Sequence, residues 1–537
     1  MATEGIQEAN PDYYLDSASG AFDKADGKTT SSLEDVARIL DKAAVDKPEN
    51  GLVIHFHGGL VSRKYALENI VPPLTEGYLT TAKAYPLFFV WQSGLLETLT
   101  NNKAELLKDP TFRELVKKVC EFAIKKTTFD KTLTFRGPTG TPIDDLEVYR
   151  KQFDDWFDGI PGTHPPVPDP DQAGAQVRSE IPVTRGAGLP SEAELEAEIL
   201  DSIQIEDPIF KEVMGAAYNA IIPTTEVVTR SAATGTTKIA SKVFLSDVAI
   251  NEMFPPPPNT EQGTKNRDAF TLFKVAKYVA KIVLAVLKRF RDNRDHGIYC
   301  TTVEEVLRSA FGDLVGANIW NQMKNDTLQA FTKGEYVGTE VVARLLALKG
   351  NGLDKVTLIG HSTGAIYICN FLDAAKSAGL SLKNWQVIFL APAVTCQRFA
   401  QAVDKHKDEG LKNFRMFAMS DELETSDNLV PVLYTRSLLY FVSGLLEGVP
   451  QGEGWDSILD MPLVGMQRFV DGNKTFKEDD AVKTVAEFLR AVPERVVWSP
   501  KSDVGPGLNS TSAKHGDFDN DPVTLASVYS LIGAKRV

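Results

Sequence analysis

The sequence predicts a large α/β fold. Strand-like and helix-like patterns alternate near both ends of the chain, as they do in α/β proteins. The chain has 537 residues, of which 43% are hydrophobic, which is enough for one large domain with an insertion or for two or three domains. Short apolar runs closed by glycine, such as GLVIHFHGG, are typical of buried strands that lead into turns.

Residues 1–50 are predicted to form an N-terminal arm followed by a helix. Residues 1–30 are polar and indicate the arm. Ser31 and Glu34 match a capping box, which predicts a helix that ends before Pro48.

Residues 51–97 and 296–537 are predicted to share one α/β core. Apolar runs bounded by turn residues predict strands, and 3.6-residue periodicity predicts helices. We expect strands within 51–60, 86–91, 355–361, 386–392, 413–419 and 495–499, and helices at 338–348 and 362–379.

Residues 98–295 lack this alternation, and we interpret them as an insertion that forms a mainly helical cap. Proline-rich segments at 159–175 and 255–258 indicate loops. A helix predicted at 269–290 carries lysines on one narrow face and apolar residues on a broad opposite arc. It is interpreted as a cap or core helix, with a lipid-binding helix as the alternative. The apolar segment 432–448 is expected to pack against or line a pocket.

The composition argues against several classes of protein. The net charge is −14 and no long basic run occurs, so no nucleic-acid partner is predicted. The polar N-terminus has neither the basic nor the apolar region of a signal peptide, and no run of about 18 apolar residues occurs, so we expect a cytoplasmic protein. The four cysteines form no CxxC pair, and there is no zinc spacing, Walker loop or dinucleotide fingerprint. We therefore expect no metal and no cofactor; the oligomeric state stays open.

The strongest chemical signal is the G-x-S-x-G segment from Gly360 to Gly364. It follows an apolar strand and opens a helix, which is the context that a nucleophile elbow requires. The tight turn holds the Ser362 hydroxyl above the sheet, beside a helix N-terminus that favours developing negative charge. His361, inside the elbow, is expected to point away from Ser362.

Four motifs occur in the order that is typical of α/β-hydrolases: strand-HGG, strand-GHSTG-helix, strand-AMSD and loop-HGDF. In these the sequence resembles lipase-like and esterase-like serine hydrolases of the α/β-hydrolase superfamily. The resemblance covers residues 51–97 and about 296–537. It implies a mostly parallel eight-stranded sheet flanked by helices, and acyl-enzyme chemistry without a cofactor.

The resemblance also implies a catalytic triad in the order serine, acid, histidine. His515 lies in the loop after the last predicted strand and would be the general base for Ser362. Asp421 follows the strand at 413–419 directly and is the predicted acid, because the sheet would hold it in place. Asp427, in the sequence DNLVP, is the alternative.

The segment from His57 to Leu60 resembles the oxyanion-hole segment of these enzymes. The main-chain N–H groups of Gly59 or Leu60 and of Thr363 would then bind the oxyanion. Gly58 would allow close approach of the backbone, and His57 is expected to support the loop.

The predicted function is hydrolysis of a carboxylic ester, either a small molecule or a lipid. A thioesterase or a membrane-associated lipase is an alternative, although the acidic charge does not favour membrane association. A further alternative is a non-catalytic ligand-binding protein that keeps the fold.

Overall fold

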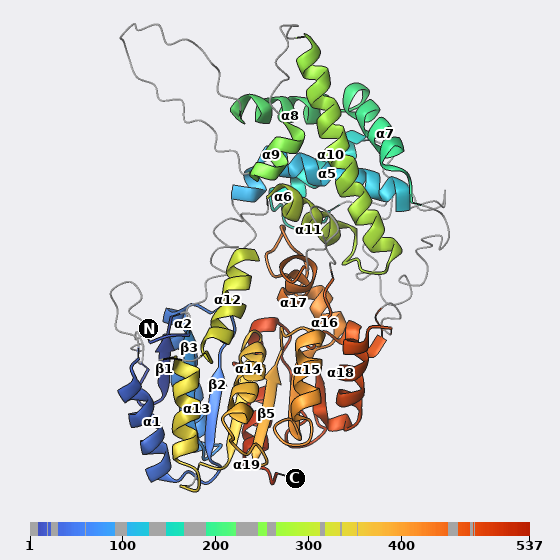
Figure 1. Ribbon diagram of the computed structural model, residues 1–537. Helices are drawn as coiled ribbons and strands as arrows, with labels where there is room; N and C mark the ends of the chain where they lie inside the picture. Colours follow the sequence, from blue (N-terminus) through green and yellow to red (C-terminus); the bar gives the residue numbers. More distant parts are fainter. Residues whose placement is uncertain are drawn as a thin grey trace, which may run out of the picture.

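The computed structural model places seven parallel strands in a single sheet, in the order β1-β3-β2-β4-β5-β6-β7 (Figure 1). It describes residues 9–18, 20–22, 31–59, 61–91, 105–127, 146–165, 189–221, 245–254, 265–311, 317–332, 334, 336–351, 353–448, 460–472, 476 and 478–536. The strands are β1 (Tyr14–Ser17), β2 (Leu52–Phe56), β3 (Tyr85–Trp91), β4 (Val356–His361), β5 (Trp385–Leu390), β6 (Asn413–Met419) and β7 (Val496–Ser499).

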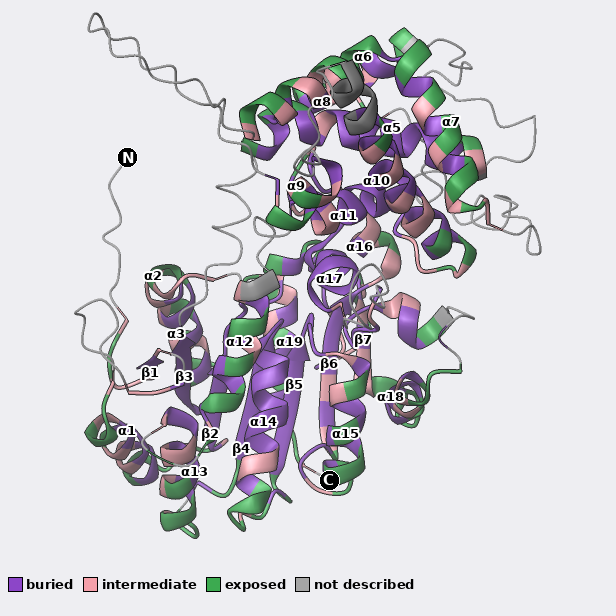
Figure 2. Ribbon diagram, turned by 45° about the horizontal axis from the view of Figure 1, so that its top comes forward, coloured by how far each residue is buried: buried purple, intermediate pink, exposed green. Residues whose placement is uncertain are grey.

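Helices cover both faces of the sheet, which explains why its strands are apolar on both sides (Figures 1 and 2). Successive side chains of a strand point to opposite faces, so Leu87 and Phe89 belong to one core while Phe88 belongs to the other. One face carries α1 (Leu33–Asp46), α13 (Val337–Ala347), α14 (Gly364–Ser377), α15 (Cys396–His406) and α18 (Asp480–Arg490). The other carries α3 (Val71–Thr80) and α19 (Pro522–Gly533).

The α/β class is confirmed, and two details of the prediction are corrected. The sheet has seven strands within the described residues, all of them parallel, where eight mostly parallel strands were expected. One of them, β1, lies in the segment that was interpreted as an arm. This strand is only four residues long and includes buried Asp16, which pairs with Arg63 at 2.5 Å, so it lacks an apolar sequence pattern. The six predicted strands are all present.

A separate layer of helices lies beyond the carboxyl ends of the strands (Figure 1). It consists of α5 (Pro110–Thr127), α6 (Leu146–Phe157), α7 (Glu192–Ile205), α8 (Pro208–Ile221), α9 (Asp247–Met253), α10 (Lys265–Arg291) and α11 (Ile298–Ala310). Buried ion pairs connect its helices: Lys118 meets Asp207 at 2.6 Å, and Arg150 meets Glu114 at 2.6 Å. No strand of the sheet falls between 98 and 295 in the described part, and α11 extends the layer beyond the predicted boundary at 295.

Helix α10 is the central helix of this layer. It packs against α5, α7, α9 and α11, and its apolar arc, including Val279 and Val283, is buried. On its lysine side, Lys281 pairs with Glu252 at 2.7 Å. The apolar arc is therefore covered by the protein itself. The segment at 432–448 is also buried, as α17 (Leu438–Phe441) and a π-helical turn, η5 (Val442–Leu446), between the helical layer and the sheet.

The strand order fixes where a site can form. From β2 the chain moves to β3 on one side, and it later returns to β4 on the other side of β2. Ligands of open α/β sheets bind outside the carboxyl ends of the strands at such a switch point. Here Phe56 of β2 pairs with Gly360 of β4, so the loops that follow these two strands meet at that place.

Candidate active site

The G-x-S-x-G segment forms a sharp turn between β4 and α14. Ser362 has a φ of +53°, a left-handed conformation that costs energy for a residue with a side chain. Its N–H donates a hydrogen bond of 2.8 Å to the Leu390 carbonyl of β5, which holds the turn on the sheet. A Cβ at Gly360 would lie 2.6 Å from the Gly364 carbonyl carbon, and one at Gly364 would overlap the Phe56 carbonyl oxygen. Both glycines are therefore required by the close approach of three backbone segments.

The glycines after β2 lie directly against this turn. A Cβ at Gly58 would be 3.4 Å from the Cβ of Ser362, and one at Gly59 would be 2.5 Å from the Thr363 Oγ1. The two predicted oxyanion donors, Gly59 and Thr363, are thus neighbours. We find no hydrogen bond from either main-chain N–H to another described residue. Leu60, the other possible donor, lies outside the described residues.

His57 supports the loop that carries Gly58. Its Nδ1 donates to the Gly58 carbonyl at 2.8 Å, and its Nε2 accepts from the Trp91 N–H at 3.2 Å. The ring also stacks on Trp91, with the centroids 4.2 Å apart. Burial lowers the pKa of His57 to about 4, so the ring is neutral at neutral pH.

His515 follows β7 in a short 3₁₀ turn, η9 (His515–Asp517), and is buried. Among the described residues, neither ring nitrogen has a hydrogen-bond partner, and the Ser362 Oγ has none either. Burial, followed by the charge of His361, lowers the pKa of His515 well below its usual value. A hydroxyl and an imidazole that are both buried without partners stand out, because buried polar groups are nearly always hydrogen-bonded.

The two candidate acids lie in different surroundings. Asp421 begins α16 (Asp421–Ser426), and its Oδ1 accepts a hydrogen bond of 2.7 Å from the Tyr440 hydroxyl. Asp427 follows the same helix, and its Oδ2 accepts a hydrogen bond of 3.1 Å from the main-chain N–H of His515. Burial raises the pKa of Asp427, and this hydrogen bond opposes the rise. The structure thus brings Asp427, and not Asp421, into a hydrogen bond with His515.

One acidic residue of the site was missed by sequence reasoning. Asp519 meets the His361 Nδ1 at 3.2 Å, while the His361 Nε2 lies 2.9 Å from the His515 carbonyl oxygen. The His361 ring thus faces Asp519 and the loop of His515. These contacts are compatible with the expectation that the ring points away from Ser362. The loop HGDFD contains two aspartates, and its pattern does not reveal which of them faces inward.

The site is closed in this structure. Ser362 is 2% exposed and His515 is 5% exposed. Met323 of α12 (Ala317–Gln329) occupies the space beside Gly59. A surface cavity of about 560 Å³ lies elsewhere, between α3 and α19, and is lined by Leu525 and Tyr529 among others. Ser362 and His515 are therefore shielded from solvent in this structure.

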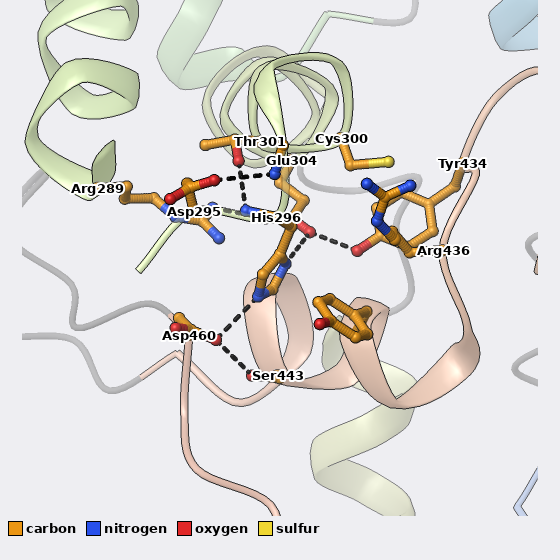
Figure 3. A network of polar contacts seen from close by, with 12 residues as sticks. Arg289, Asp295, His296, Cys300, Thr301, Glu304, Tyr434, Arg436, Ser443 and Asp460 are labelled. Carbon is orange, nitrogen blue, oxygen red and sulfur yellow. Dashed lines mark hydrogen bonds and ion pairs between the residues drawn. The ribbon is translucent and has the colours of Figure 1, made fainter. Parts of the chain in front are cut away.

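A second buried cluster of charges joins the helical layer to the sheet domain (Figure 3). His296, just before α11, meets the Glu304 Oε1 at 2.7 Å through Nδ1 and the Asp460 Oδ1 at 2.8 Å through Nε2. Arg289 of α10 meets the other oxygen of Glu304 at 2.6 Å, and Arg468 meets Asp460 at 3.2 Å. Burial alone would raise the pKa of Glu304, but Arg289 and His296 outweigh it and lower this pKa to about 2. Arg289, His296, Glu304 and Asp460 are buried and paired with one another or with Arg468, so we assign the cluster a structural role.

Neither a metal site nor a membrane span is found in the part of the chain that the structure describes. Its histidines, cysteines and carboxylates form no group of three that could hold a metal ion. None of its helices combines the length and the hydrophobicity that crossing a bilayer needs. Comparison of the chain with protein-family models, curated proteins and solved structures finds no match.

Proposed function

We propose that the protein is a serine hydrolase of the α/β-hydrolase type that cleaves carboxylic esters. The observation that carries this proposal is the strained Ser362 at the switch point of the sheet, with Gly58 and Gly59 packed against it. Energetically costly backbone conformations cluster at active sites and ligand-binding positions. The buried, unpartnered ring of His515 supplies a base in the same region.

The proposed mechanism runs through an acyl-enzyme. His515 accepts the proton of Ser362 as the serine oxygen bonds to the ester carbonyl carbon, and the N–H groups of Gly59 and Thr363 hold the oxyanion. His515 then gives the proton to the departing alkoxide as the C–O bond breaks. Water repeats the two steps on the acyl-enzyme and releases the acid. We propose oxygen esters because an alkoxide leaves more easily than an amine anion.

The Ser362–His515 hydrogen bond is not formed in this structure, since neither group has a partner among the described residues. Catalytic hydrogen bonds often form only when substrate is bound. We assign the orienting acid to Asp427 instead of Asp421, because its carboxylate already contacts the His515 main chain at 3.1 Å. The second carboxylate oxygen of Asp427 would then accept a hydrogen bond from the imidazole N–H of His515.

Labelling by a fluorophosphonate probe tests the proposal. Wild-type protein should react at Ser362, and Ser362→Ala should not react. The matched control is Ser377→Ala, an exposed serine at the end of the same helix α14, which should label fully. Absence of wild-type labelling, together with no hydrolysis of short-chain p-nitrophenyl esters, would instead support a ligand-binding protein.

A membrane-associated lipase is the less favoured variant. The apolar arc of α10, which suggested lipid binding, is buried against other helices. Co-sedimentation with vesicles of phosphatidylcholine and phosphatidylserine would test it, and we expect the protein to stay in the supernatant.

A further inference from the structure

The residue that precedes the nucleophile, His361, contacts His515 in two ways. Its Nε2 lies 2.9 Å from the His515 carbonyl oxygen. Its ring also stacks on the His515 ring, with the centroids 5.3 Å apart and the planes at 27°. The main chain and the side chain of the proposed base are thus both held by one neighbouring side chain.

The hydrogen-bond partners of His361 determine its charge. A carbonyl oxygen only accepts hydrogen bonds, so the Nε2 must carry a hydrogen. The Nδ1 faces the Asp519 carboxylate at 3.2 Å, and an ionised carboxylate also only accepts. Burial opposes ionisation of both groups, but their attraction outweighs it, so the pKa of His361 is raised and that of Asp519 is lowered. The pair is therefore an imidazolium and a carboxylate.

The other histidines near this pair are neutral, and the nearby Asp427 contacts the main chain of His515. On β2 and the turn after it, burial lowers the pKa of His55 to about 3 and that of His57 to about 4. Asp427 contacts the His515 main chain, and Lys514 and Asp517 lie close to the Asp427 carboxylate. The imidazolium of His361 is thus the charge that stacks directly on the base.

We propose that His361 and Asp519 form a positioning ion pair behind the nucleophile, which fixes the His515 loop and keeps the His515 ring uncharged and ready to accept the serine proton. This inference rests on the proposed function, because it assigns His515 the role of base. Two imidazolium rings at the stacking distance repel each other, so protonation of His515 is opposed as long as His361 is charged. His361 and Asp519 are positioning residues, since neither reaches the reacting atoms.

Titration of the imidazole rings tests the pair without any need for hydrolysis. Histidine labelled with ¹³C at Cε1 reports the protonation of each of the seven rings by NMR, and single substitutions assign them. In the wild-type protein, His361 should remain charged at pH 7 while His515 is neutral. In His361→Gln, whose amide can still donate to the His515 carbonyl, the midpoint of His515 should rise by about one pH unit. Asp519→Asn should lower the midpoint of His361, because the Asp519 carboxylate raises the pKa of that ring.

The control uses a histidine–carboxylate pair outside the candidate site. His406 meets Asp373 at 2.9 Å on the α14–α15 side of the sheet, and His406→Gln should leave the His515 midpoint unchanged. A neutral His361 at pH 7 in the wild type, an unmoved His515 midpoint in His361→Gln, or an unmoved His361 midpoint in Asp519→Asn overturns the proposal. If neither variant folds, the wild-type titration still decides it.

Kinetics provide a second readout that a merely structural role would not produce. In His361→Gln, the acidic limb of kcat/KM for a soluble ester should move upward by the same amount as the NMR midpoint. His361→Leu also loses the hydrogen bond to the His515 carbonyl and should lower kcat roughly tenfold further, with little change in KM. If Ser362→Ala keeps full hydrolysis, the proposed function fails, and the NMR titration judges the ion pair independently.

Discussion

Glu304→Gln should strongly destabilise the junction between the helical layer and the sheet domain. The substitution keeps the shape of the side chain but removes its charge, and it leaves Arg289 and His296 facing a neutral amide in a fully buried place. The pKa of Glu304 is about 2 in the folded protein and 4.5 in the reference state. This difference corresponds to about 3 kcal/mol of folding free energy at neutral pH. Removal of one partner from a buried ion pair typically costs about 3–5 kcal/mol, so two independent arguments agree.

The sign of the pH dependence follows from the same values. Because the folded-state pKa lies below the unfolded one, the contribution of Glu304 is present above pH 4.5 and is lost as the pH falls toward about 2. Urea unfolding, followed by tryptophan fluorescence, should therefore show a large difference between wild type and Glu304→Gln at pH 7. The difference should shrink progressively below pH 4.5.

The matched control is Glu252→Gln. Glu252 pairs with Lys281 at 2.7 Å but is partly exposed, with 35% of its side chain accessible. Such pairs contribute about 0–1 kcal/mol. If Glu304→Gln costs no more than Glu252→Gln, or if its effect is the same at pH 3 and pH 7, then the buried cluster does not hold the two parts together as we infer.

Three further predictions concern catalysis. Asp427→Asn should lower kcat by up to about 10⁴-fold, and Asp421→Asn should lower it far less. Single-turnover assays measure both effects. If Asp421→Asn is the more damaging, Asp421 is the acid, as the sequence predicts. The kcat/KM of the wild type should fall only well below pH 6.5, because the pKa of His515 is lowered by burial and by the His361 charge; a profile with a midpoint at or above 6.5 would contradict the buried, neutral base. Lys277→Gln and Lys281→Gln should leave hydrolysis of a short soluble ester within about twofold, because both lysines form ion pairs within the helical layer, and a complete loss would place α10 in the catalytic site.

Much of the fold could be predicted because its signals are local. Each of the six predicted strands is an apolar run that ends in turn residues, and both faces of the sheet are covered, so the runs are long and clear. Strand β1 could not be predicted, because its buried Asp16 is compensated by Arg63, which lies 47 positions along the chain. An ion pair of that kind leaves no periodicity in the sequence.

The tight turn around Ser362 could be predicted for a similar reason. The glycines at 58, 59, 360 and 364 are required by close backbone contacts, and such requirements appear in the sequence as motifs. The choice between Asp421 and Asp427 depends on how the loop at 515 contacts the loop at 427. No local sequence pattern reveals such a contact. The partners of His296, which lie as far away as Asp460, were beyond sequence reasoning for the same reason.

The parallel pairing of β2 with β4 has a consequence for how the chain folds. Leu52 lies beside Val356 in the sheet, and all the helices of the helical layer lie between these two residues in the sequence. Contacts between residues so distant in the sequence form slowly, because the entropy of a long loop is lost before the contact contributes favourable free energy. The helices of the layer, whose contacts are more local, can assemble first and thereby shorten the loop that remains. The turn at Ser362 lies at the end of this pairing, so its strained conformation depends on a contact that closes a loop of about 300 residues.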